Sequence, residues 1–153
     1  MPMRVAFIAA ECEPWAKTGG LADVVDALAR ALGQLTSTHL ETPVDVFLPR
    51  YRGVPVPAGA AAARAIRVPD PYALGGVSDV TIINVAANGY RLRLVDHPPA
   101  FDRAGYYGES GADYDDNAWR FGLLCRAALT MLLDEGRPPD VLHLHDWHAA
   151  PAA

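Results

Sequence analysis

Apolar and polar positions follow one another along the chain in blocks that predict strands and helices. Residues 4–10 (RVAFIAA) form a short, almost entirely apolar run, which indicates a strand buried on both faces of a parallel sheet. After a loop, apolar side chains recur at helical spacing, and Gly33 is the expected helix end. The predicted apolar face of this helix comprises Leu21, Val24, Val25, Leu28 and Leu32. Residues 44–48 (VDVFL) predict a second strand, and this order of elements predicts a right-handed βαβ unit.

The middle of the chain carries fewer signals. Residues 54–65, rich in alanine and proline, predict a loop. Residues 79–85 and 90–95 flank the pair Asn88-Gly89. Such a pair is the strongest short signal for a β-hairpin, because both central residues of the turn need positive φ. Residues 98–114, rich in glycine, aspartate and tyrosine, predict a long surface loop.

The last part of the chain returns to a helix and a strand. Residues 116–134 predict a mostly buried helix, because its polar side chains share one narrow stripe. The stripe comprises Asp116, Arg120, Arg126, Thr130 and Asp134. Residues 141–144 predict another short strand, and the segment HDWH follows it. The expected fold class is therefore α/β: a partial Rossmann-like domain with a parallel sheet and an inserted β-hairpin.

Composition narrows the classes of partner. The chain has 153 residues, which predicts one domain, and a net charge of -5 without a basic run, which argues against nucleic acid and anionic membranes as partners. No apolar stretch is long enough to span a bilayer, and the first apolar run meets Glu11 too early for a signal peptide. The two cysteines, Cys12 and Cys125, have no metal-ligand spacing. We therefore expect a cytoplasmic protein with free thiols.

Two polar segments follow predicted parallel strands. Residues 11–20 leave the carboxyl end of the first strand, and residues 145–148 leave that of the last strand. Ligands of open parallel sheets bind beyond the carboxyl ends of the strands. If the two strands are neighbours, both segments lie on one rim, which predicts a binding site there.

A lysine and two glycines stand at the mouth of the first predicted helix. Lys17 is the only lysine of the chain, and Gly19 and Gly20 follow it. Free amides and the positive end of the helix dipole favour a phosphate at such a place, and an ammonium adds a full charge. Alternatively, the glycines make only a tight turn and Lys17 is a solvated surface charge. Asp23, in the first helical turn, could simply complement the helix dipole.

The remaining candidates are carboxylates, histidines and a tryptophan. Glu11, at the end of a strand, suits sugar hydroxyls or serves as a structural carboxylate. The segment from His143 to His148 has the order H-x-H-D-x-H, which permits a metal site. Alternatively, Asp146 and His148 recognise a sugar beside the flat face of Trp147, or Trp147 belongs to the core.

Several motifs together resemble one family, the bacterial glycogen synthases and plant starch synthases, which are retaining glycosyltransferases of the GT-B fold. The stretch "AECEPWAKTGGLADVVDALARAL" resembles the opening strand, donor loop and helix of that family. The stretches "FLPRY", "FDRAGYYGESGADYDDNAWRFGLLCRAAL" and "PDVLHLHDWH" resemble later segments in the family order. Asp26 and Arg30 depart from the family pattern, in which glycine and lysine are common at these places.

The resemblance implies transfer of glucose from ADP-glucose to the non-reducing end of an α-1,4-glucan with retention of configuration, without a further cofactor. It implies that Lys17 binds the donor, that Gly19 and Gly20 approach its phosphates and that Asp23 lies beside that loop. It places Glu11 and Trp147 on the glucose and acceptor side. It assigns catalytic roles to Asp146 and His148.

The resemblance also implies that residues 1–153 form an incomplete amino-terminal Rossmann-like domain. A GT-B active site lies between two such domains, so the carboxy-terminal half of the enzyme is an implied partner, and we expect the isolated chain to be inactive. Two other functions remain open at this point: a non-catalytic module that binds sugar or glucan, and a metal-dependent hydrolase.

Overall fold

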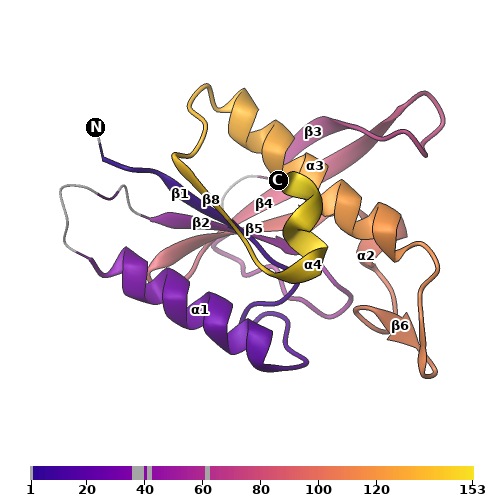
Figure 1. Cartoon of the computed structure of the whole chain (residues 1–153), viewed down its shortest axis with the longest axis horizontal. Helices are drawn as coiled ribbons and strands as arrows, with labels where there is room; N and C mark the ends of the chain where they lie inside the picture. The colour runs from indigo at the N-terminus through magenta and orange to yellow at the C-terminus, as the bar shows by residue number, and fades with distance from the viewer. Residues whose placement is uncertain (1, 36–39, 41–42, 61–62) are drawn as a thin grey trace.

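A computed structural model describes residues 2–35, 40, 43–60 and 63–153. In this part of the chain the main feature is a six-stranded sheet of order β3-β4-β5-β2-β1-β8 (Figure 1). Its strands are β1 (Val5–Ile8), β2 (Val44–Pro49), β3 (Arg64–Pro69), β4 (Val77–Ala86), β5 (Tyr90–Asp96) and β8 (Val141–Leu144). The helices are α1 (Gly20–Gly33), α2 (Pro98–Phe101), α3 (Asn117–Asp134) and α4 (Asp146–Ala149), with a 3-10 turn η1 (Ala150–Ala152). Two short strands, β6 (Gly108–Glu109) and β7 (Ala112–Asp113), form a small antiparallel hairpin.

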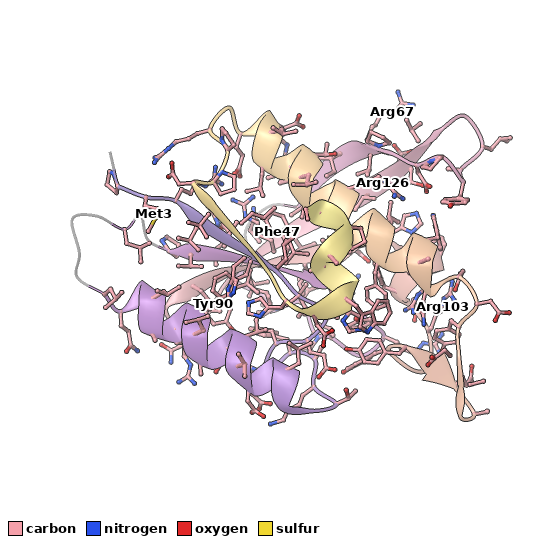
Figure 2. The ribbon with its side chains drawn as sticks, viewed as in Figure 1. Met3, Phe47, Arg67, Tyr90, Arg103 and Arg126 are labelled. Atoms are coloured by element: carbon pink, nitrogen blue, oxygen red, sulfur yellow. The ribbon has the colours of Figure 1, made fainter. Side chains whose placement is uncertain are left out.

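The central strands confirm the predicted parallel sheet. β1 pairs in parallel with β2 and with β8, and β2 pairs in parallel with β5. Helices α1 and α3 lie on opposite sides of this sheet (Figure 1). The connection from β1 through α1 to β2 and the connection from β5 through α3 to β8 cross the sheet in opposite directions, so right-handed crossovers place their helices on opposite faces. Both faces of β1 and β2 are therefore buried, and Phe47 lies in the middle of the resulting core (Figure 2). The edge strand β8 is only partly covered.

The predicted hairpin is confirmed, but its turn differs in detail and a strand beside it was not predicted. β4 pairs with β5 in antiparallel fashion, and of the Asn-Gly pair only Gly89 has a positive φ, of 89°. β3 adds to the outer side of β4, so the loop predicted over residues 54–65 is wrong at its end; residues 61–62 lie outside the described residues. The short β3 alternates between exposed and buried positions because only one face contacts the core.

The buried stripe of α1 is rotated from its predicted position. Val24 is 56% exposed, which contradicts its assignment to the apolar face. The buried residues of the helix are Ala22, Val25, Asp26 and Ala29. Small side chains allow the helix to approach the sheet closely, and the predicted Leu21, Leu28 and Leu32 flank this contact as half-buried residues. The helix ends at Gly33, as predicted.

The predicted surface loop over residues 98–114 is partly buried, because it covers the polar stripe of α3. Phe101 in α2 is fully buried. Arg120, also fully buried, donates hydrogen bonds to the carbonyl oxygens of Ala100 (2.6 Å) and Tyr106 (2.9 Å). This part of the polar stripe therefore anchors the loop instead of facing solvent. No helix in the described part of the chain is long and apolar enough to cross a membrane.

Candidate functional site

The two polar segments predicted to share a rim do so. β1 and β8 are parallel neighbours, so the loop after β1 and helix α4 after β8 both lie at the carboxyl ends of the strands. Between them is a hollow of about 370 Å³. It is lined by Glu11, Gly19, Gly20, Leu21, Tyr107, Asp113, Asp146, Trp147 and His148. Six of the eight predicted site residues are in this lining, and the prediction of a common rim is confirmed.

Glu11 lines the hollow and stabilises the loop of residues 11–20 through hydrogen bonds. Its carboxylate is 3% exposed and accepts hydrogen bonds from the Thr18 amide (2.7 Å), the Thr18 hydroxyl (2.6 Å), the Gly19 amide (3.2 Å) and the Tyr107 hydroxyl (2.6 Å). Burial by itself would raise the pKa of Glu11, but these four bonds hold that pKa below its usual value. The carboxylate is therefore ionised, and its lone pairs are already used within the protein.

The two glycines leave the mouth of α1 open. Gly19 is the N-cap, in an extended conformation with φ of -156°, and neither glycine has a positive φ. A methyl group added at Gly19 or Gly20 would meet no atom within 4 Å in the part of the chain that the structure describes. Neither the backbone conformation nor the packing of the described residues therefore requires glycine here. The first-turn amides of α1 also have no capping side chain from the N-cap residue.

Lys17 and Asp23 lie beside the hollow and do not line it. The Lys17 ammonium contacts the carboxylates of Asp23 (2.6 Å) and Glu13 (3.2 Å), and its side chain is 44% exposed. Hydrogen bonds to Asp23 and Glu13 raise the pKa of Lys17, so it carries a full charge at neutral pH. The structure thus places the ammonium in an exposed carboxylate pair at the helix mouth.

Asp146, Trp147 and His148 form the opposite wall. Asp146 has a φ of 63°, uncommon outside glycine, and accepts a hydrogen bond from the Trp147 amide at 2.6 Å. The ring of Trp147 stacks on that of His148 with 3.9 Å between centroids, yet Trp147 is 53% exposed. Trp147 is therefore not an ordinary core residue, because it offers a free aromatic surface to the hollow.

His148 is buried between aromatic rings and is neutral at pH 7. Its ring lies 4.7 Å from that of Tyr107 and 4.8 Å from that of Phe121. Burial lowers the pKa of His148, although Asp146 and Glu11 oppose that effect. Its Nδ1 atom is buried and has no hydrogen-bond partner among the described residues. A neutral imidazole with an unused nitrogen can accept or donate one hydrogen bond.

The histidine cluster does not form a metal centre. Within the described ranges, no group of three or more histidine, cysteine, aspartate or glutamate side chains is arranged to hold a metal ion. His143 and His145 pack against Phe7 instead, each with 4.9 Å between ring centroids. Burial and the neighbouring His143 lower the pKa of His145 to about 4. These rings belong to the packing around β1.

Three lining residues were not predicted as site residues. Leu21 was expected only on the apolar face of the first helix, and the other two are Tyr107 and Asp113. Both belong to the segment that precedes α3, which connects to the rim through the bond from the Tyr107 hydroxyl to Glu11. The segment resembled the synthase family, but three tyrosines in one irregular stretch give no periodic signal that singles out Tyr107. Only the contact with Glu11 identifies it.

The fold and the site together define a class of protein. A parallel sheet that carries a glycine-bearing helix mouth and polar loops at the carboxyl ends of its strands is the architecture of Rossmann-like, nucleotide-binding α/β domains.

Comparison with known proteins gives the family. The starch synthase catalytic domain family matches residues 4–153, and the chain belongs to that family. Glycogen synthase of Koribacter versatilis is 41% identical over 154 residues, which cover 97% of this chain and 29% of the relative. Glycogen synthase of Paracoccus denitrificans is 41% identical over 151 residues, which cover 95% of this chain and 30% of the relative.

A solved structure agrees with this assignment. The catalytic domain of starch synthase IV from Arabidopsis thaliana, bound to ADP and acarbose, superimposes with a TM-score of 0.77 at 33% identity. The match covers 99% of this chain and 29% of that structure. The chain therefore spans less than a third of the length of these relatives, and the predicted fold, an amino-terminal GT-B-like segment with a mostly parallel sheet, is confirmed.

Proposed function

We propose that this chain supplies one wall of the active site of a glycogen or starch synthase. The complete enzyme would transfer glucose from ADP-glucose to the non-reducing end of an α-1,4-glucan with retention of configuration. In this proposal residues 1–153 are an incomplete amino-terminal domain, and the carboxy-terminal half supplies the opposite wall. The relatives that match the chain are glycogen synthases, and the related starch synthase structure holds ADP and acarbose.

The observation that carries the proposal is the open glycine pair at the mouth of α1. Because Gly19 and Gly20 are needed neither for a left-handed backbone nor for packing, the approach of a ligand remains the reason for two bare positions. Helix amides favour a phosphate there, and Lys17 adds a positive charge close by. In the proposed reaction these groups stabilise the leaving diphosphate while the acceptor hydroxyl attacks from the same face.

Within the hollow of this chain, the wall formed by Asp146, Trp147 and His148 suits a sugar. The exposed side chain of Trp147 can stack on a pyranose ring, and His148, which lines the hollow beside it, presents a neutral imidazole to that sugar. We assign Asp146 and His148 to the region of the reacting glucose. Glu11, which accepts hydrogen bonds from Thr18, Gly19 and Tyr107, then fixes the loop at the helix mouth and the Tyr107 ring beside His148.

The proposal can be tested with a hybrid enzyme. The segment of Koribacter versatilis glycogen synthase that matches this chain, 29% of that protein, is replaced by residues 1–153. Release of ADP from ADP-glucose with a glycogen primer supports the synthase function. A folded hybrid that binds glycogen without turnover would instead support the non-catalytic module.

Expressed alone, the 153-residue chain should release no ADP above background. In this proposal most contacts to the diphosphate come from the carboxy-terminal half, and the chain covers only 29% of its relative. The assay compares the isolated chain with the hybrid at equal concentration. Turnover by the isolated chain at the rate of the hybrid would contradict the proposed division of the active site.

Lys17→Ala in the hybrid should weaken donor use about ten- to a hundredfold, because a charge-assisted contact to the diphosphate is lost. Lys17→Arg should not restore it fully, since the planar guanidinium is larger and differently hydrated. Titrations that vary ADP-glucose and then glycogen separate the donor effect from the acceptor effect. Arg64→Ala is the matched control, because Arg64 on β3 is an equally exposed cation and is paired with an aspartate, Asp134 on α3. Equal kinetics for Lys17→Ala and Arg64→Ala would make Lys17 an ordinary surface charge.

A further inference from the structure

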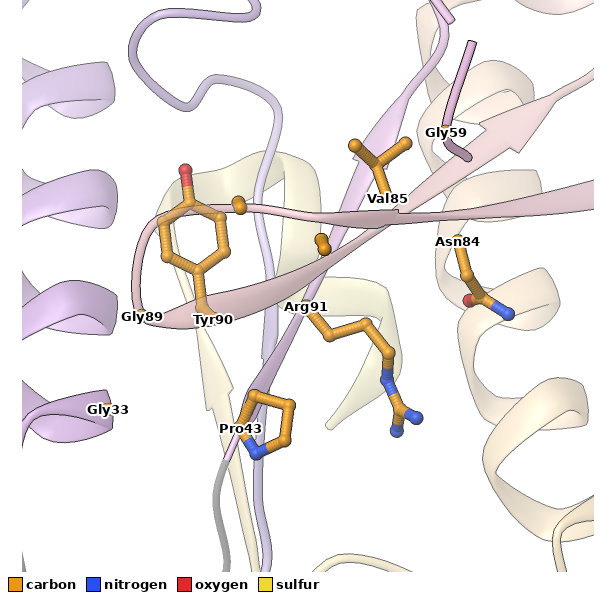
Figure 3. A pocket seen from close by; sticks show the side chains of 10 residues that line it. Gly33, Pro43, Gly59, Asn84, Val85, Gly89, Tyr90 and Arg91 are labelled. Atoms are coloured by element: carbon orange, nitrogen blue, oxygen red, sulfur yellow. The ribbon is translucent and has the colours of Figure 1, made fainter. Parts of the chain in front are cut away.

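A buried tyrosine connects the β4–β5 hairpin to the loop of residues 11–20. Tyr90, the first residue of β5, is 3% exposed, and its ring forms part of the wall of a cavity of about 470 Å³ beside Gly33 and Pro43. In Figure 3 its hydroxyl points away from Pro43 and Arg91. Figure 2 shows the same side chain next to α1. The hydroxyl thus leaves the cavity and reaches the other side of the hairpin.

The hydroxyl of Tyr90 meets three polar groups there. It lies 3.2 Å from a carboxylate oxygen of Asp26, 3.4 Å from the Cys12 sulfur and 3.4 Å from the Glu13 carbonyl oxygen. Burial raises the pKa of the Tyr90 hydroxyl well above its usual value, so the phenol keeps its proton and donates it. Burial likewise raises the pKa of Cys12 to about 12, and its neutral thiol can donate to the phenol oxygen.

Asp26 is a fixed acceptor for this bond. It is 8% exposed, and Arg30, one helical turn further along α1, binds it with N–O distances of 2.9 and 2.7 Å. Asp26 and Arg30 are two positions at which the sequence departs from the pattern of the family it resembles. Asp26 is therefore a buried acceptor within hydrogen-bond distance of the Tyr90 hydroxyl.

The contacts continue into the loop at the helix mouth. The Cys12 amide donates a hydrogen bond to the Ala16 carbonyl oxygen, and the Ala16 amide donates one to the Cys12 carbonyl oxygen, each at 2.9 Å. The side chain of Glu13 contacts the Lys17 ammonium at 3.2 Å. One buried hydroxyl thus holds the segment from which Lys17 is presented.

We propose that Tyr90 is a positioning residue that holds the loop of residues 11–20 against α1 through Asp26, Cys12 and Glu13. Its hydroxyl fixes the start of the loop, and the loop in turn places Lys17 and the glycine pair. The position of the loop follows from the contacts alone, whereas its consequence for the donor rests on the proposed synthase function.

The two cysteines allow a test on the chain itself. Cys12 lies in the loop and Cys125 in α3, and both are free and buried. A thiol-reactive disulfide reagent modifies each only when its surroundings open, and peptide mass spectrometry distinguishes the two sites. Tyr90→Phe removes the hydroxyl alone and should raise the modification rate of Cys12 up to about tenfold, the effect of one lost buried hydrogen bond, without changing that of Cys125.

A role in general stability would give a different result. In that case Tyr90→Phe would raise the modification rates of Cys12 and Cys125 together. An equal rise at both cysteines, or no rise at Cys12, would overturn the proposal. Asp26→Ala should raise the rate of Cys12 in the same way. The double variant should add little to either single change, because both remove the same bond.

The hybrid enzyme separates this proposal from the proposed function. There Tyr90→Phe should raise the apparent KM for ADP-glucose and leave that for glycogen unchanged. Faster modification of Cys12 with an unchanged donor KM would uphold the positioning of the loop and contradict its role in donor binding.

Discussion

Asp45→Asn should lower the free energy of unfolding by about 3–5 kcal/mol, the usual effect of removing one partner from a buried ion pair. The carboxylate of Asp45 is 1% exposed and contacts three guanidinium groups: Arg91 at 2.5 Å, Arg93 at 2.9 Å and Arg4 at 3.2 Å. Arg93 is itself fully buried. An amide cannot balance these charges, although Glu135 still contacts Arg4 and Arg93.

Urea unfolding of the 153-residue chain measures this effect. Asp79→Asn is the matched control, because Asp79 and its partner Arg67, 4.0 Å away, are 89% and 76% exposed. Such an exposed pair contributes little, so the control should keep the midpoint of the parent chain. Equal midpoints for the two variants would show that the charges around Asp45 are solvated.

The stability that Asp45 contributes should depend on pH. Burial by itself would raise the pKa of Asp45, but hydrogen bonds and charges from Arg91 and Arg93 hold that pKa below its usual value. A lowered pKa in the folded state means that the contribution is present above the unfolded value, about pH 4, and is lost as pH falls through the folded value. The parent chain should therefore approach the stability of Asp45→Asn in acid.

The parallel core and the rim could be predicted because they depend on local patterns. The short apolar runs now seen as β1 and β2 are typical of strands buried on both faces. Because β1 and β8 are parallel neighbours, the direction of the strands places Glu11 and the segment from Asp146 to His148 at the same edge of the sheet.

Long-range contacts could not be predicted in the same way. The charges of Asp45 and Arg91 are visible inside apolar runs, but their pairing depends on the register that places β2 beside β5. The contact of Tyr107 with Glu11 depends on how an irregular segment folds over Arg120. The four hydrogen bonds to Glu11 likewise join residues whose sequence pattern does not connect them.

Gly33 at the end of α1 lies very close to Gly89 in the hairpin turn. For Gly33→Ala, packing and helix propensity therefore predict changes of opposite sign in the free energy of unfolding. Alanine is a better helix residue than glycine by up to about 1 kcal/mol, so from the sequence Gly33→Ala at the end of α1 should be stabilising. A methyl group at Gly33 would, however, lie 1.6 Å from the carbonyl oxygen of Gly89. Gly89 cannot easily move, since its φ of 89° belongs to the hairpin turn.

Gly33→Ala should therefore lower the free energy of unfolding by about 2–3 kcal/mol, as overpacking of a close backbone contact does. Gly20→Ala, at the other end of the same helix, is the control, because its methyl group would meet no atom of the described part of the chain within 4 Å. Urea unfolding should show a loss for Gly33→Ala and none for Gly20→Ala, whereas in the hybrid enzyme Gly20→Ala should impair donor use by obstructing the helix mouth. A Gly33→Ala chain as stable as the parent would mean that α1 does not rest on the hairpin turn.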